Sequence, residues 1–139
     1  METSQVLDTI GNLVAALKSF SAKVLANAPM AIPGGVKPTP EAIEHYEDTV
    51  YRFRDRAGST YKRLPGFLLE SLEAFEAGRV FDAVPPLLQA LDQLEMLQQE
   101  EKIKMTAAEN ERVRDCRGRL HKILPETIKP EVDLPPPTS

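Results

Sequence analysis

The chain has 139 residues, of which 42% are hydrophobic, and this size suits one domain with a single core. Its 21 acidic and 17 basic side chains give a net charge of −4, which disfavours bulk attraction to nucleic acid or to an anionic membrane. The single cysteine, Cys116, excludes an internal disulfide and a thiol-rich zinc site. The N-terminus lacks the basic start of a signal peptide, and no apolar run approaches the ~20 residues of a membrane span. We therefore expect a cytoplasmic or nuclear protein.

The first predicted element is a long amphipathic helix over about residues 3–27. Its apolar residues alternate steps of four and three, which is a heptad-like seam: Val6, Ile10, Leu13, Leu17, Phe20 and Val24. A linker rich in proline and glycine, residues 29–39, ends the helix because proline cannot continue it. The pattern leaves open whether this helix packs on its own chain or on another.

Two further helices are predicted between the linker and Gly78. Thr39 is the expected N-cap of the first, since its hydroxyl can accept from free backbone N–H groups while Pro40 occupies the first turn. Gly58 separates this helix from the next, and Gly78 is the expected stop of the next. Their apolar stripes are Ile43, Tyr46, Val50, Phe53 and Ala57, and then Tyr61, Leu64, Leu68, Leu72 and Phe75.

The fourth helix is predicted from about Asp82 to about Lys104. This start places Pro85 and Pro86 among the first residues, where N–H groups have no partner within the helix. A fifth helix is predicted to begin at Thr106, because Thr106 and Glu109 match the reciprocal capping box. The two apolar stripes are Val80, Val84, Leu87, Leu91 and Leu94, and then Val113, Cys116, Leu120 and Ile123, with Pro125 as the end.

These stripes predict an all-α fold, a four- to five-helix antiparallel bundle with heptad-like seams. The predicted organisation is an N-terminal amphipathic helix (1–28), a linker (29–39), a helical bundle (40–125) and a Pro-rich tail (126–139). The tail has four prolines and few apolar residues, so we expect it to be extended or disordered. Its segment 132–137 is also a candidate for docking into an aromatic groove.

Charge is unevenly distributed along the chain. Segments 52–63 and 112–122 each hold five basic residues and one acidic residue, whereas 70–101 holds eight acidic residues and one arginine. One interpretation is structural, with ion pairs between neighbouring helices each worth ~0.2–1 kcal/mol. The other is functional, with an exposed basic face that binds an acidic partner helix, a phosphorylated motif or RNA phosphates.

The sequence offers no complete catalytic constellation. His45 and His121 are the only histidines, and Cys116 and His121, five residues apart on a helix, point in different directions. Glu41, His45 and Asp48 share a helix face but lack a further metal ligand, so a solvated helix start explains them better. We expect no enzymatic activity, no metal and no cofactor.

The function that uses most of these features is protein–protein docking. We expect a non-enzymatic adaptor or small subunit of an assembly, forming a hetero-oligomer or a homodimer through helix packing. The expected contacts are apolar residues off the main face of the fourth helix, together with orienting arginines: Leu88, Met96, Leu97 and Ile103, with Arg52, Arg56, Arg112 and Arg119. On this hypothesis Leu97→Asp abolishes binding and leaves the bundle folded. The alternatives are an RNA- or phosphate-binding module that uses segments 52–63 and 112–122, disfavoured by the acidic net charge, and a small chaperone for a client protein.

Overall fold

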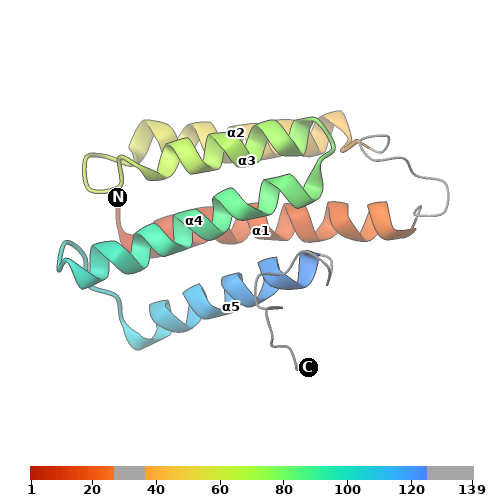
Figure 1. Ribbon diagram of the computed structural model, residues 1–139. Coiled ribbons are helices and arrows are strands. Elements are labelled where there is room, and N and C mark those ends of the chain that lie inside the picture. The colour runs from red at the N-terminus through yellow and green to blue at the C-terminus, as the bar shows by residue number, and fades with distance from the viewer. Residues whose placement is uncertain (27–36, 125–139) are drawn as a thin grey trace, which may run out of the picture.

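Five helices make up the described part of the chain. The computed structural model describes residues 1–26 and 37–124, with helices α1 (Thr3–Ala26), α2 (Pro40–Arg56), α3 (Leu64–Glu76), α4 (Val80–Gln99) and α5 (Ala107–Ile123). Successive helices run in opposite directions, so α1, α3 and α5 point one way and α2 and α4 the other (Figure 1). The all-α bundle predicted from the periodicity is confirmed. The predicted tail, and all of the predicted linker except residues 37–39, lie outside the described residues.

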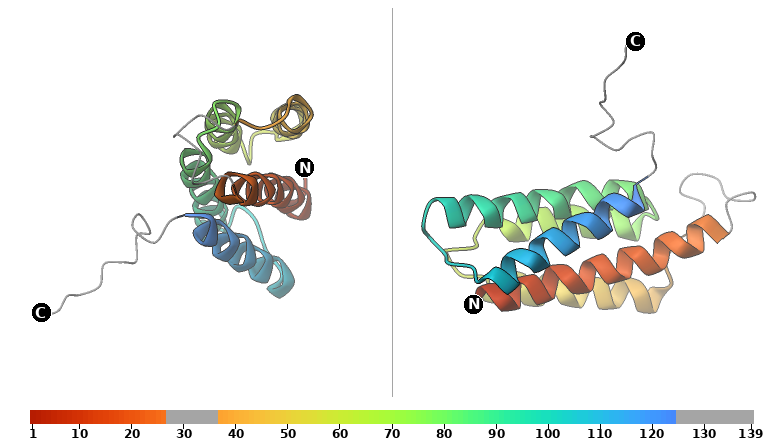
Figure 2. Two further views of the ribbon diagram at one scale, coloured as in Figure 1. Left: turned by 90° about the vertical axis from the view of Figure 1, so that its right-hand side faces the viewer. Right: turned by 90° about the horizontal axis from the view of Figure 1, so that it is seen from below.

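Helix α1 packs within its own chain, which the sequence left open. It contacts α2, α4 and α5, while α4 contacts α1, α3 and α5. Seen end-on, α1 to α4 form a four-helix arrangement, and α5 lies against α1 and α4 (Figure 2). Helices α1 and α4 are therefore central, and neighbours cover their wide apolar faces on more than one side.

The five predicted stripes face one continuous core. Every stripe residue is buried except Val24 and Ile43, which are partly buried against that core. Helix α1 also buries a second stripe that was not predicted, formed at heptad spacing by Leu7, Val14 and Ser21. A helix buries a second stripe only when it has neighbours on several sides, and the number of neighbours is a property of the packed bundle.

Both predicted N-terminal caps are present. The Thr39 side chain accepts from the Ala42 N–H at 3.1 Å, and Pro40 occupies the first helical position of α2. In α5 the capping box is complete, because the Glu109 N–H donates to the Thr106 hydroxyl at 3.1 Å and the Thr106 N–H donates to the Glu109 carboxylate at 2.9 Å. These local signals set the starts of two helices.

The two ends of α4 differ from the prediction. The helix begins at Val80, ahead of Asp82, because the Arg79 N–H donates to the Ala74 carbonyl and the chain passes directly from α3 into α4. Pro85 and Pro86 therefore lie inside the helix. It ends at Gln99, five residues before Lys104, because Glu101 adopts a left-handed conformation with φ of 61°.

Glu101 forms the same helix end as Gly78. At the end of α3, Gly78 has φ of 77°, and the N–H groups of Gly78 and Arg79 donate to the carbonyls of Phe75 and Ala74. At the end of α4, the N–H groups of Glu101 and Lys102 donate in the same way to Gln98 and Leu97. Both are Schellman motifs, and only the one that uses glycine is visible in the sequence.

A buried polar chain links α2, α3 and α4. The Tyr46 hydroxyl donates to Ser71 Oγ at 2.6 Å, and Ser71 Oγ donates to the Ala83 carbonyl at 2.7 Å. Burial raises the pKa of Tyr46, so the phenol stays protonated and remains a donor. Its ring stacks on Phe75 with a centroid distance of 4.4 Å, and Phe75 meets Phe20 of α1 edge to face. This cluster fixes the relative positions of the helices at the centre of the core.

Candidate functional site

The four apolar residues expected to form a docking face lie in different places. Leu97 is only 4% exposed, and it shares the inward face of α4 with Ala90 and Leu94. The expected outer position of Leu97 is therefore wrong, because α4 is a central helix with a wide buried face. Leu88 and Ile103 are partly buried, whereas Met96 is 45% exposed. Leu88 and Met96 are eight residues apart, which turns them about 80° from one another around the helix.

The four expected arginines divide into two pairs. In α5, Arg112 binds Asp8 of α1 at 2.7 Å, and Arg119 binds Asp115 one turn away at 3.0 Å. In α2, Arg52 and Arg56 are exposed and form no ion pair with any residue that the structure describes. The structure thus brings no more than two of these arginines onto a common face.

Arg117, which is not among the predicted contact residues, forms ion pairs between α5 and α4. Its guanidinium bridges Asp92 and Glu95 of α4, at 2.8 Å to each, and the side chain is 27% exposed. Beside it, the side-chain amides of Gln98 and Asn110 join α4 to α5 through two hydrogen bonds of 3.3 Å. Part of basic segment 112–122 therefore neutralises acidic segment 70–101, and its charge is less available to a ligand.

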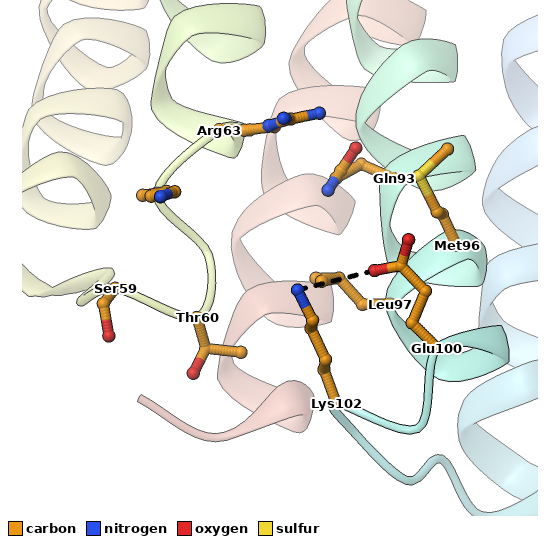
Figure 3. Close-up of a pocket in the computed structure, with 9 residues that line it drawn as sticks. Ser59, Thr60, Arg63, Gln93, Met96, Leu97, Glu100 and Lys102 are labelled. Carbon is orange, nitrogen blue, oxygen red and sulfur yellow. Dashed lines mark ion pairs between the residues drawn. The ribbon is translucent and has the colours of Figure 1, made fainter.

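A concave surface lies where the α2–α3 turn meets the C-terminal end of α4 (Figure 3). It encloses about 510 Å³, and we call it the basic groove. Its lining residues are Ser59, Thr60, Lys62, Arg63, Gln93, Met96, Leu97, Glu100 and Lys102. A volume of this size is within the range of ligand-binding clefts.

The α2–α3 turn forms one wall of the basic groove. Gly58, with φ of 76°, ends α2 and redirects the chain. Tyr61 then anchors the turn, since its side chain is 4% exposed and its hydroxyl lies 2.8 Å from the Thr3 hydroxyl of α1. With Tyr61 buried, Lys62 and Arg63 on the same turn stay exposed at the rim of the groove.

The end of α4 forms the opposite wall. Two of its lining residues are neighbours in sequence, Leu97, which is buried, and Met96, which is exposed. The left-handed Glu101 turns the chain so that Lys102 comes back toward Glu100, with 3.6 Å between the ammonium and the carboxylate. In Figure 3 the side chains of Arg63 and Lys102 extend from opposite walls into the space of the groove.

The basic groove has an excess of positive charge. It holds three cations, Lys62, Arg63 and Lys102, and one carboxylate, that of Glu100. Within the described residues, Lys62 and Arg63 have no ion-pair partner. The guanidinium of Arg63 can bind a carboxylate or a phosphate through two parallel hydrogen bonds, while Met96 offers apolar contact. In the sequence, Arg63 belongs to a basic segment and Met96 to the surplus apolar residues of the fourth helix, and neither pattern indicates that the two share one groove.

Two observations on the described residues concern the cysteine thiol and the groups that bind metal ions. Burial, followed by repulsion from Asp115, raises the pKa of the Cys116 thiol, which disfavours the reactive thiolate. Across residues 1–26 and 37–124, His, Cys, Asp and Glu side chains form no cluster of three that could hold a metal ion. In the same ranges, no helix combines the length and hydropathy that a membrane span requires.

Comparison with protein-family models, with curated proteins and with solved structures found no match.

Proposed function

We propose that this protein is a non-enzymatic adaptor or small subunit of an assembly, and that the basic groove binds a segment of a protein partner that carries both acidic and apolar residues. We place it in the cytoplasm or the nucleus, in keeping with its single, buried thiol. The observation that carries the proposal is that one groove is lined by exposed Met96 and by Arg63, which has no ion-pair partner among the described residues.

Met96 supports the apolar half of the proposal. Together with Tyr51, it is one of two large hydrophobic side chains that are exposed in the described part of the chain. The side chain of methionine is unbranched and polarizable, so it can adapt to different apolar partners. Leu97, which is buried and also lines the groove, adds a second apolar residue to it.

Lys62 and Arg63 support the acidic half. Arginine is enriched at protein interfaces, and charges at the rim of an interface steer association and set its orientation. Arg52 and Arg56 are exposed on α2, which leads into the same turn, so they add to the positive potential at this end of the bundle. Arg112 and Arg119 are paired with carboxylates and have no part in the proposed contact.

Selection from a phage-displayed library of short random peptides tests this function. We expect the selected peptides to place Glu or Asp beside Leu, Ile, Val or Met, and to shift the methyl NMR signal of Met96. Arg63→Glu should weaken their binding at least tenfold, because the guanidinium that we expect to bind the acidic residue is replaced by a carboxylate. Arg79→Glu is the matched control, since Arg79 is also an exposed arginine but lies at the other end of α4. Selected peptides without acidic residues, or equal binding to both variants, would contradict the proposal.

The second candidate is binding of RNA, favoured by Arg52 and Arg56 on the helix that leads into the turn of the groove, since both are exposed and form no ion pair within the described residues. In fluorescence anisotropy with a labelled single-stranded RNA, this function predicts an affinity that falls steeply with salt and with Arg52→Glu. An affinity that does not change with salt would dismiss it.

A further inference from the structure

We propose that the basic groove of one copy binds residues 131–134 of a second copy, so that the chain forms a symmetric dimer by exchanging C-terminal segments. This inference rests on the proposed function, because it names a partner for the same groove. It uses the described groove together with the sequence of a segment that lies outside the described residues.

The segment has the alternating chemistry that the groove requires. Its sequence is Glu131-Val132-Asp133-Leu134, preceded by Pro130 and followed by three prolines. In an extended chain successive side chains point to opposite sides, so both carboxylates would lie on one side and both apolar residues on the other. The flanking prolines restrict the backbone, which lowers the conformational entropy lost on docking.

The two sides of the segment match the two sides of the groove. Its two carboxylates complement the groove, where three cations face a single carboxylate. The valine and leucine side chains match the apolar contact offered by Met96. Arg63, which has no ion-pair partner among the described residues, is the group we expect to hold a carboxylate with paired hydrogen bonds.

The geometry of the bundle favours the segment of a second copy over that of the same chain. Helix α5 ends at the opposite end of the bundle from the α2–α3 turn (Figure 1). Helix α4, which spans this distance, has 20 residues and a length of about 30 Å. Glu131 follows Leu124 by seven residues, whose fully extended reach of about 25 Å is less than the length of α4. A second copy has no such limit, and reciprocal exchange gives a closed twofold dimer.

A charge-swap experiment on the full chain tests this proposal. The groove variant carries Lys62→Glu and Arg63→Glu, and the tail variant carries Glu131→Lys and Asp133→Lys. Light scattering and sedimentation should show a dimer for the unmodified chain and a monomer for each variant alone, since each then meets like charges. Mixing the two variants should restore a dimer, because the acidic groove then faces the basic segment and the unmodified groove faces the unmodified segment. Arg79→Glu should remain dimeric, and circular dichroism should show all variants to be folded, because the changed groove residues are exposed.

Three results would overturn the inference. The first is an unmodified chain that stays monomeric at the concentrations used for NMR. The second is a dimer that persists in both charge-reversed variants, and the third is a mixture of the two variants that does not form a dimer. If library peptides still bind the groove of a monomeric chain, the proposed function stands and only the identity of the partner is wrong. If peptides and segment both fail to bind, both proposals fall.

Discussion

Removal of the Ser71 hydroxyl should destabilise the bundle far more than removal of the Tyr46 hydroxyl that binds it. Ser71→Ala deletes the bond to the Ala83 carbonyl, a loss of about 1 kcal/mol, and leaves the buried Tyr46 hydroxyl without a partner, a further ~1–3 kcal/mol. The free energy of unfolding should therefore fall by about 3 kcal/mol. Tyr46→Phe removes the donor but leaves Ser71 bound to Ala83, so the expected loss is about 1 kcal/mol.

The double variant decides whether this reasoning is right. With the Tyr46 hydroxyl already absent, Ser71→Ala leaves no buried hydroxyl without a hydrogen-bond partner. The free energy of unfolding of the double variant should therefore fall by only about 2 kcal/mol. Tyr46→Phe thus stabilises the Ser71→Ala protein. Urea unfolding followed by circular dichroism at 222 nm measures all four proteins. A double variant whose free energy of unfolding falls by the sum of the two single losses would refute the coupling in the buried polar chain.

Three other substitutions test separate features of the fold. Leu97→Asp should unfold the chain, at a cost above about 4 kcal/mol, because it places a carboxylate at a 4% exposed position. Met96→Asp, at an exposed position, should change the free energy of unfolding by less than about 0.5 kcal/mol. A cooperative thermal melt of the Leu97→Asp protein would show that it is folded and would contradict this expectation. Glu101→Gly should raise the free energy of unfolding by about 0.5–1 kcal/mol, because glycine tolerates φ of 61°, while Glu100→Gly at φ of −84° should give no gain in the same urea titration. The pKa of Glu76 is raised by a hydrogen bond to Glu47, then by desolvation and by the charges of Glu47 and Glu73. A group whose pKa is raised in the folded state contributes stability that is complete below its ordinary pKa and is lost as the pH rises through its folded-state pKa. Glu76→Gln should therefore raise the urea midpoint at neutral pH and leave it unchanged in acid.

The positions of the five helical segments and most of their boundaries follow from the sequence, because these depend on information within a few residues. The capping box at Thr106 and Glu109 and the glycine at position 78 act through neighbouring backbone groups, so their meaning does not depend on the fold. Apolar periodicity likewise places Tyr46 and Leu87 in the core, because any packed helix must bury its apolar face.

Tertiary structure decided what depends on the neighbours of a helix. Leu97 and the second stripe of α1, which includes Leu7 and Val14, are buried because α4 and α1 each contact three helices. Glu101 ends α4 in a conformation that glutamate rarely adopts, so its residue type gave no signal. The basic groove exists because Arg63 and Met96, 33 positions apart in sequence, are brought together by the antiparallel packing of α3 and α4. The local pattern holds no information about such a distance, and therefore only the packed bundle shows the candidate site.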